Sequence, residues 1–155
     1  MESHTLDPID IKILNLLQTD GLMSNRELAM QTHRSPNPIN ERVARLKKLG
    51  IIKKTVAIID HKKAKSLFIS YIFIQLTGHS KENFKNFLDC IANLPQIMEC
   101  AHVTGRYDFV LKVVVDNLNA YNDFLTEQIS TVDFVHKVES FPVLGQTKSE
   151  TKYHL

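Results

Sequence analysis

The 155-residue sequence has few of the residues that usually build a redox, metal or catalytic centre. Its two cysteines, Cys90 and Cys100, form neither a CxxC motif nor a histidine-flanked metal-binding set. One falls in a helical pattern and the other in a strand pattern, so both are predicted to be buried thiols. No nucleophile with a base at motif spacing, glycine-rich phosphate loop or carboxylate pair is present. The sequence therefore predicts a protein that is not an enzyme and that uses no cofactor and no metal.

Long apolar runs and a strong net charge are also missing. No apolar run approaches transmembrane length, and the start MESHTLDPID lacks the basic and apolar parts of an export signal. A soluble, cytoplasmic protein without a membrane partner is predicted. The net charge is only +2, but residues 34–54 hold seven Lys or Arg and one acid, Glu41. This local excess is the charge footprint expected where DNA phosphates are contacted.

Two helix starts lie about a dozen residues apart within this region. Ser24 and Glu27 form a capping-box pattern, in which the hydroxyl and the carboxylate each satisfy a free backbone N–H. Ser35 followed by Pro36 is a second start, with a hydroxyl cap and a proline at the first helical position. Because only the polar residues 32–34 separate the two helices, the pattern predicts a helix-turn-helix.

The second of these helices has an apolar side and a polar, mostly basic side. Ile39, Val43 and Leu46 recur at i, i+4 and i+7 and are predicted to face the core. The plain alternative for the other side is a solvated helix face. The predicted DNA-binding residues are Arg34, Ser35, Asn37, Asn40, Glu41, Arg42, Arg45, Lys47, Lys48, Lys53 and Lys54.

Within this set, four residues have individual expected roles. Arg42 is expected to contact phosphates, while Asn37 and Arg45 are better placed for base edges, Asn for adenine and Arg for guanine. Glu41 has a simpler alternative as the i, i+4 surface partner of Arg45.

A first helix precedes the helix-turn-helix, with Asp7 as its cap and Pro8 at its first position. Gly50 is placed to end the last helix of this unit. The following residues 51–59 are rich in Ile, Val and Thr and carry two lysines, which suggests a short wing with a basic tip. Residues 1–60 are thus predicted to form a winged helix-turn-helix, and the polar residues 61–66 a linker.

The second half, residues 67–155, alternates between strand and helix patterns. Strands are predicted at 67–76, 97–103, 109–115 and 132–144. Ser80 caps a helix that ends before Pro95, and Asp116 or Asn117 caps a second helix. The resulting order βαββαβ is the ferredoxin-like arrangement, which makes the whole chain an α+β protein.

Two of these strands are apolar on both faces. In 67–76 and 109–115, Ser70, Gln75 and Lys112 are the few polar exceptions. Two helices can cover only one face of a four-stranded sheet, and the tail after residue 145 is mostly polar and too short to cover the other. We therefore expect this face to pack on the same sheet of a second copy.

Several motifs, taken together and in order, are similar to one family over essentially the whole chain. They are LDPIDIKILNLLQTDG near the N-terminus, the SP-P segment at 35–38, LGII at 49–52, the VTGRYDF loop and the ETKYHL end. The chain resembles the Lrp/AsnC family, the feast/famine regulators of bacteria and archaea. The resemblance implies a DNA-binding domain and an amino-acid-sensing ferredoxin-like domain of the RAM type. It also implies dimers that often assemble into octamers, with effectors bound near the VTGxYD loop.

In this chain the predicted effector-binding residues are Thr104, Gly105, Arg106, Tyr107 and Asp108. Their backbone N–H groups, carboxylate, guanidinium and hydroxyl suit the ammonium and carboxylate of a free amino acid. From the residues alone, an ordinary hairpin turn whose Asp satisfies turn amides is the favoured explanation of the loop, and the family resemblance reverses this preference toward a ligand site. Arg106 departs from the acidic or small polar residue that the family often has there, so the effector's identity stays open.

Two histidines in the predicted sheet and two alternative functions also have to be considered. His102 and His136 lie in predicted strands and are interpreted as plain hydrogen-bonded strand residues, with titrating switches or ligand-binding groups as the alternative. An enzyme resembling the sirohaem decarboxylases, which are similar to this family in fold, is one alternative function. An architectural DNA-compacting protein without an effector is another. The main expectation is a sequence-specific transcription regulator that responds to a small effector, with an amino acid favoured.

Overall fold

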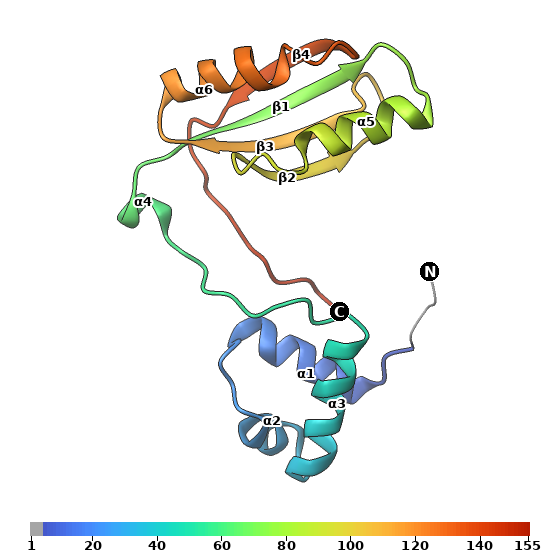
Figure 1. The fold of residues 1–155 in the computed structure, drawn as a ribbon. Helices are drawn as coiled ribbons and strands as arrows, with labels where there is room; N and C mark the ends of the chain where they lie inside the picture. Colours follow the sequence, from blue (N-terminus) through green and yellow to red (C-terminus); the bar gives the residue numbers. More distant parts are fainter. Residues whose placement is uncertain (1–4) are drawn as a thin grey trace. The chain divides into compact units, whose positions relative to one another are not determined.

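The computed structural model describes residues 5–155, which fold as two compact units (Figure 1). One unit extends to Ile58 and also includes Lys148–Leu155, and the other is Ile59–Thr147. The C-terminal tail therefore belongs to the first unit, although the sequence grouped it with residues 67–155. Its backbone is held there by Gln18, whose side chain donates to the Tyr153 carbonyl over 3.1 Å and accepts from the Tyr153 N–H over 2.7 Å.

Three helices make up the core of the first unit, and their starts follow the sequence closely. They are α1 (Pro8–Thr19), α2 (Asn25–Thr32) and α3 (Pro36–Lys48). Asp7 and Ser24 each complete a capping box, as predicted for Ser24. Ser35 stands at the N-cap position of α3, but its side chain makes no capping hydrogen bond. Proline at the first helical position leaves one N–H fewer to satisfy there.

The turn between α2 and α3 depends on one unusual backbone conformation. His33 has a φ of 54°, in the left-handed region, and its N–H returns to the end of α2. This bend directs the chain into α3 within three residues. Ile39, Val43 and Leu46 are then buried against Ile13 and Leu28, as the apolar stripe predicted.

The segment expected as a wing is irregular in this structure. Residues 53–60 are exposed and contain no strand among the described part of the chain. A β-prone segment needs a partner strand to form a ladder, and this unit supplies none. A one-turn helix, α4 (His61–Ala64), follows within the predicted linker and is capped by Asp60.

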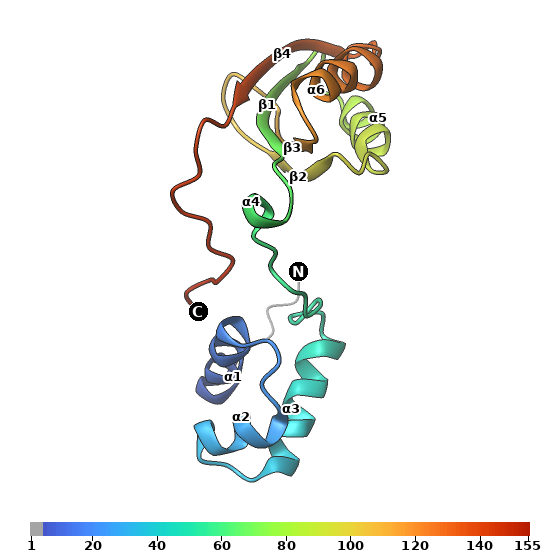
Figure 2. The ribbon, with the colours of Figure 1, turned by 90° about the vertical axis from the view of Figure 1, so that its left-hand side faces the viewer.

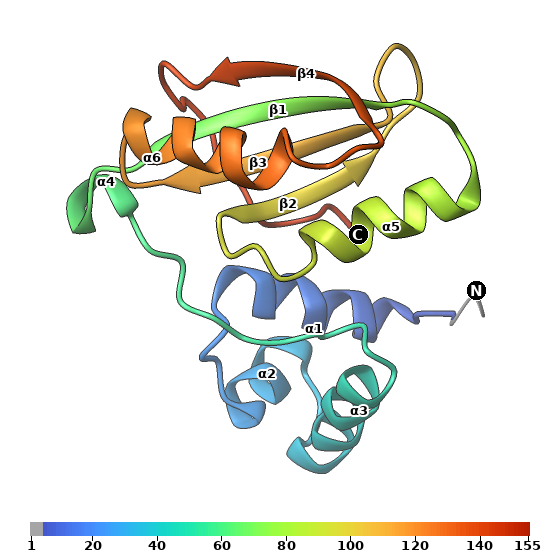
Figure 3. The same ribbon diagram turned by 45° about the horizontal axis from the view of Figure 1, so that its top comes forward.

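The second unit is a four-stranded antiparallel sheet with two helices on one face (Figures 1 and 3). Its strands are β1 (Phe68–Leu76), β2 (Ile97–His102), β3 (Phe109–Val115) and β4 (Val135–Pro142), in the order β2-β3-β1-β4. The helices are α5 (Lys81–Ile91) and α6 (Leu118–Phe124), the latter continued by a π-helical turn, η1 (Leu125–Ile129). The predicted βαββαβ order is confirmed, with β4 shorter at both ends than expected.

The helix-covered face of this sheet is the core of the unit. Ile72 and Ile74 of β1 and Leu111 and Val113 of β3 are fully buried there beside Phe87 of α5. Ser70, a polar exception in the sequence pattern, is buried on the same face. Its hydroxyl lies 3.1 Å from the Tyr121 hydroxyl, which lies 2.6 Å from that of Ser140. This chain of hydrogen bonds explains how a polar residue is accommodated in the core.

The opposite face of the sheet has no helix over it in the described chain (Figure 2). Tyr71 and Phe73 of the central strand β1 lie on this face, and the Phe73 ring meets Phe141 of β4 edge-on at 5.1 Å. Phe141 is 51% exposed. The apolar pattern on both faces is therefore real, and one of the two faces is open to solvent within a single chain.

Two further expectations can be compared with the structure. Cys90 and Cys100 are both exposed, so the prediction of buried thiols is wrong. Cys100 lies on β2, an edge strand of the sheet, and Cys90 lies on the solvent side of α5. No helix within residues 5–155 is long and apolar enough to cross a membrane.

Candidate functional site

The outer side of α3 exposes a series of polar and charged residues. Asn37, Asn40 and Glu41, in its N-terminal half, are exposed, and so is Arg34 in the preceding turn. Lys47 and Lys48 continue the exposed surface at the C-terminal end of the helix. An exposed polar helix on a tight turn after another helix is the geometry that places side chains in the major groove of DNA.

Two arginines of α3 are engaged inside the unit. The carboxylate of Asp10, on α1, has a side chain only 1% exposed. It accepts from Arg42 over 2.9 Å and makes a second, very short contact with Arg45. Arg42 also contacts the cap residue Asp7. Arg42 was predicted to contact phosphates and Arg45 to contact a base edge. Instead, both side chains hold α3 against α1 by binding acids that sequence reasoning did not connect with them.

The protonation of this cluster follows from its contacts. Burial alone would raise the pKa of Asp10, but the hydrogen bonds from Arg45 and Arg42 outweigh burial and lower it. The pKa of Asp7 is lowered by the Asp10 backbone N–H and by Arg42. Both carboxylates are therefore ionised at neutral pH, and the buried charge of Asp10 has two cationic partners. A buried charge with such partners avoids the cost that an unpaired one would incur.

The remaining basic residues of the predicted set are free of such contacts. Lys53 and Lys54 lie in the exposed segment after α3. Within residues 5–155, no ion pair is formed by these two lysines or by Arg34, Lys47 and Lys48. The group that can meet phosphates is therefore shifted from the middle of α3 toward its two ends. Solvated cations of this kind provide sequence-independent attraction to DNA.

The loop between β2 and β3 contains the five predicted effector residues. Gly105 has a φ of 122°, a backbone conformation that residues other than glycine rarely adopt. A Cβ added at this position would meet no atom within 4 Å. The glycine is required by the backbone of the turn and not by close packing. Thr104 and Arg106, on either side of it, are exposed.

Asp108, at the end of this loop, is buried and already has partners. One carboxylate oxygen accepts from the Leu76 N–H over 2.8 Å, and the other lies 3.0 Å from His79 Nε2. Neither partner belongs to the β2–β3 turn, so the carboxylate of Asp108 binds the end of β1 and His79 and not the turn amides that the sequence suggested. His79 was missed by sequence reasoning, because nothing in its surroundings indicates a contact with a residue 29 positions away.

Arg106 is the exposed charged group of the loop. Its guanidinium is 3.9 Å from Glu139 of β4 and lies 5.6 Å from the centre of the Tyr107 ring. The neighbouring Lys137 lowers the pKa of Glu139 through a close side-chain contact, so that carboxylate stays ionised. The side chain of Arg106 is 69% exposed, which leaves it able to bind a ligand.

The two histidines singled out by the sequence lie in ordinary surroundings. The His102 ring sits 4.9 Å from that of Phe84 and 5.1 Å from that of Phe109. His136 is exposed on β4. No group of three or more His, Cys, Asp or Glu in the described residues is arranged to hold a metal ion.

The ion pairs of Asp10 are expected to stabilise the folded first unit. Asp10→Asn should lower the free energy of unfolding of the first unit by about 3 kcal/mol at neutral pH, the low end for breaking a buried pair because solvent reaches both arginines. The pKa of Asp10 is depressed in the folded state, so its stabilisation exists above the unfolded pKa of about 3.9 and disappears as pH falls through the folded value. Urea unfolding of wild type, Asp10→Asn and the exposed control Asp123→Asn from pH 7 to pH 3 measures this. Equal stability of the three proteins at pH 7 would contradict it.

Comparison with known proteins identifies the two units. Residues 6–53 match a winged helix-turn-helix DNA-binding family, and residues 69–153 match the Lrp/AsnC ligand binding domain. The chain is 32% identical over 147 residues to the leucine-responsive regulatory proteins of Klebsiella pneumoniae and Escherichia coli K12, covering 95% of this chain and 90% of theirs.

Solved structures agree with this assignment. A transcriptional regulator from Neisseria meningitidis in complex with L-Met superposes with a TM-score of 0.87 at 27% identity, covering 97% of both chains. AsnC of Escherichia coli gives a TM-score of 0.86, also at 27% identity, over 96% of this chain and 99% of that one. With a helix-turn-helix for DNA and a ferredoxin-like domain for a ligand, this chain belongs to the Lrp/AsnC family of transcriptional regulators.

Proposed function

We propose that this protein regulates transcription in the cytoplasm by binding specific duplex DNA through α3 and by responding to a free amino acid. The observation that carries the proposal is the exposed, polar and basic outer side of α3 in a chain that also has the family's ligand-binding domain. The names of the relatives, a leucine-responsive protein and a regulator in complex with L-Met, favour an amino-acid effector. The same names favour regulation over the enzymatic alternative.

The contacts of the two arginines change how the DNA-binding residues are assigned. Asn37 and Asn40 are the residues of α3 best placed for base edges, because their side chains are exposed and carry no charge partner. Arg45 is 47% exposed and keeps donors for DNA while it holds Asp10, and Arg42 acts chiefly by fixing α3. Phosphate contacts are assigned to the lysines and to Arg34 at the ends of the helix. Ser35 and Glu41 border this surface.

The first prediction for this function separates base reading from phosphate contact. Asn37→Ala should reduce the preference for a cognate site over a scrambled duplex by about tenfold, as expected for losing one bidentate base contact of 1–3 kcal/mol. Replacing Lys53 and Lys54 by Ala should weaken both duplexes alike and lower the log–log salt slope by about 0.9 for each lysine that meets a phosphate.

Fluorescence anisotropy at several salt concentrations measures both quantities. Lys81→Ala, an exposed lysine at the start of α5, is the matched control and should change neither. If the wild type binds cognate and scrambled DNA equally, the architectural alternative replaces sequence-specific regulation. If Asn37→Ala keeps the full preference, Asn37 does not read a base.

A dimer is proposed from the open sheet face. Tyr71, Phe73 and Phe141 form an aromatic cluster there, beside Val110 of the neighbouring strand β3. Exposed apolar faces of this kind mark interfaces between subunits. A two-fold symmetric pair of sheets would cover the same residues on both copies and carry two α3 helices to a pseudo-palindromic site. Assembly of such dimers into octamers, implied by the family resemblance, would require a second surface.

Placing a charge on this face should prevent the pairing. Tyr71→Asp should convert the protein to a monomer at micromolar concentration, because the carboxylate would be buried without a partner in the dimer but solvated in the monomer. Light scattering coupled to size-exclusion chromatography gives the mass, and circular dichroism shows whether the fold is kept. Lys85→Asp, on the outside of α5, is the control and should remain dimeric. A folded Tyr71→Asp with unchanged mass would show that the dimer uses another surface.

The effector site is assigned to the β2–β3 loop. Arg106 is placed to bind an effector carboxylate, with the Thr104 hydroxyl and the backbone around Gly105 as further donors. Asp108 is assigned the α-ammonium through its remaining lone pairs, while its bonds to Leu76 and His79 keep the loop in shape. Tyr107 lines the loop beside Arg106. Such a ligand changes DNA binding only if it binds one assembly state better than another.

Calorimetry with each of the twenty amino acids tests this assignment. The wild type should bind a small subset, Arg106→Ala should weaken it by about tenfold through the loss of a charge-assisted hydrogen bond, and Asp108→Ala should abolish it. Lys85→Ala, away from the loop, should bind like the wild type. A wild type that binds none of the twenty removes amino-acid sensing from the proposal. Full affinity in Arg106→Ala and Asp108→Ala moves the site elsewhere.

A further inference from the structure

Within residues 5–155, the ion-pair partner of the buried Asp108 carboxylate is a histidine from another loop. His79 lies between β1 and α5, and its Nε2 is 3.0 Å from Asp108 Oδ1. The side chain of Asp108 is 9% exposed, whereas that of His79 is 70% exposed. The imidazole therefore lies on the solvent side of an acid that is itself almost closed to solvent.

The two oxygens of Asp108 have partners that are held to different extents. Oδ2 accepts from the Leu76 N–H over 2.8 Å, and this donor belongs to the backbone of β1. Oδ1 contacts the side chain of His79, in a segment, residues 77–80, that contains no helix or strand. The ring of His79 also meets that of Phe84 edge-on, with 6.2 Å between the ring centres. Rotation of one exposed side chain is therefore enough to free Oδ1, while Oδ2 stays bound to the strand.

An imidazole N–H and an α-ammonium group make the same kind of contact with a carboxylate, because both donate a hydrogen bond and both can carry positive charge. The solvent side of Asp108 is the side from which a free amino acid would approach, and His79 already lies there. When the imidazole is protonated, the two donors would also repel each other at such a short separation. The α-ammonium and His79 are therefore alternatives for Oδ1 and not joint partners.

We propose that His79 competes with the effector for Asp108, so that the imidazole occupies in the free protein the place that the α-ammonium takes on binding. This inference rests on the amino-acid site proposed at the β2–β3 loop. In the free protein the contact with His79 helps to keep the loop in shape, and the bond to Leu76 alone keeps it once His79 has moved away.

The competition has a consequence for sensing. The apparent affinity is the intrinsic affinity reduced by the fraction of molecules in which the binding-competent arrangement exists, here the one with His79 turned away from Asp108. His79 thereby raises the amino-acid concentration to which the protein responds. A ligand without an amino group does not need Asp108, so its affinity is independent of His79.

Calorimetry on the full-length protein tests the competition, with leucine and methionine, which the names of the relatives indicate, as first probes. His79→Ala should bind the amino acid about fivefold more tightly than the wild type, the effect of removing a competing pair with one exposed member. His79→Gln should stay close to the wild type, because its amide can still donate to Asp108. His154→Ala, at an exposed histidine of the C-terminal tail, is the matched control and should bind like the wild type.

The same molecules without the amino group provide the second comparison. They are 4-methylpentanoate for leucine and 4-(methylthio)butanoate for methionine. His79→Ala should gain no affinity for either compound, because neither has an ammonium group to place on Asp108. A histidine that acted only by shaping the loop would change the binding of both kinds of ligand.

Nuclear magnetic resonance of protein with isotope-labelled histidine reports on the ring directly. The Nε2 resonance of His79, assigned by its loss in His79→Gln, should shift when the amino acid binds and should not shift with the compound that lacks the amino group. A His79 that stays on Asp108 in the complex would keep its resonance.

The proposal is overturned if His79→Ala binds amino acids no more tightly than the wild type, or if the Nε2 resonance is unchanged at saturation. An equal gain for ligands with and without the amino group would also overturn it. The effector site itself survives these results if Asp108→Ala still abolishes binding. If neither the wild type nor His79→Ala binds any of the twenty amino acids, the amino-acid effector of the proposed function is wrong, and the competition is wrong with it.

Discussion

The DNA-binding unit depends on one buried carboxylate. Asp10 is inaccessible to solvent, yet it is ionised, because Arg42 and Arg45 reach it from α3. This contact fixes the rotation of α3 about its own axis, since two arginines three positions apart must both point toward α1. Asn37 and Asn40, which are exposed on the outer side of the same helix, are thereby held in one orientation. Specificity for a base sequence requires such a fixed orientation, because base edges are read by side chains at defined positions.

The same contact divides the positive charge of the unit between two tasks. Arg42 and Arg45 neutralise internal acids, and the lysines at the end of α3 and beyond remain solvated. Internal neutralisation contributes to stability and geometry but little to attraction for DNA. In the proposed binding mode, the free lysines contribute long-range attraction to DNA but no geometry. A count of basic residues in the sequence cannot separate these contributions, since both kinds of residue lie on one short stretch.

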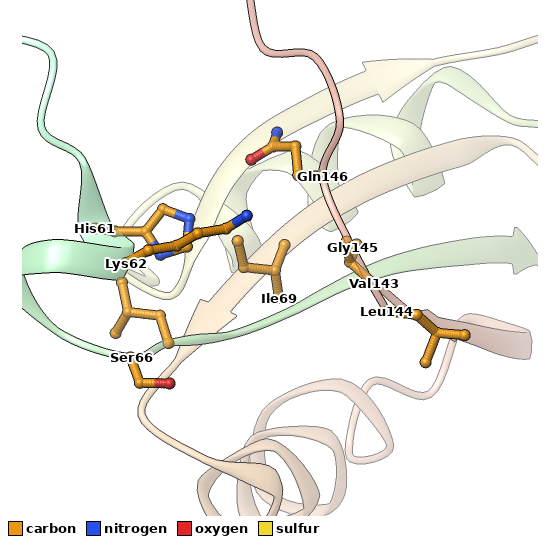
Figure 4. Close-up of a pocket in the computed structure, with 9 residues that line it drawn as sticks. His61, Lys62, Ser66, Ile69, Val143, Leu144, Gly145 and Gln146 are labelled. Carbon is orange, nitrogen blue, oxygen red and sulfur yellow. The ribbon is translucent and has the colours of Figure 1, made fainter.

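In the second unit, the sheet connects the surfaces for which dimerisation and effector binding are proposed. One face is filled by α5 and α6, and the other carries the aromatic cluster of Tyr71, Phe73 and Phe141. The loop that contains Arg106 lies at one end of β1. At the other end, Ile69 and Val143 line a cavity of about 240 Å³ and continue the open face in line with Tyr71 and Phe141 (Figure 4). A partner on the open face and a ligand at the Arg106 loop would therefore both act on one rigid element. That arrangement provides a physical route by which small molecules affect assembly.

Much of this fold could be predicted because it follows from local patterns. The capping box of Ser24 with Glu27, the apolar stripe of α3 and the alternation in β1 and β3 are all short-range signals. The features that sequence reasoning missed depend on contacts between distant residues. Asp10 lies 35 positions from Arg45, and Gln18 lies 135 positions from Tyr153. The exposure of Cys100 likewise depends on β2 being an edge strand, which only the strand order reveals.

In the proposed function, α3 positions a symmetric pair of chains on specific DNA. Hydroxyl-radical footprinting of the wild type on a genomic binding site tests it most directly. The account predicts protected patches on one side of the duplex, in pseudo-palindromic half-sites about one helical turn of roughly 10 base pairs apart, or a multiple of that spacing. Uniform protection without preferred positions, or a single unpaired half-site, would contradict it.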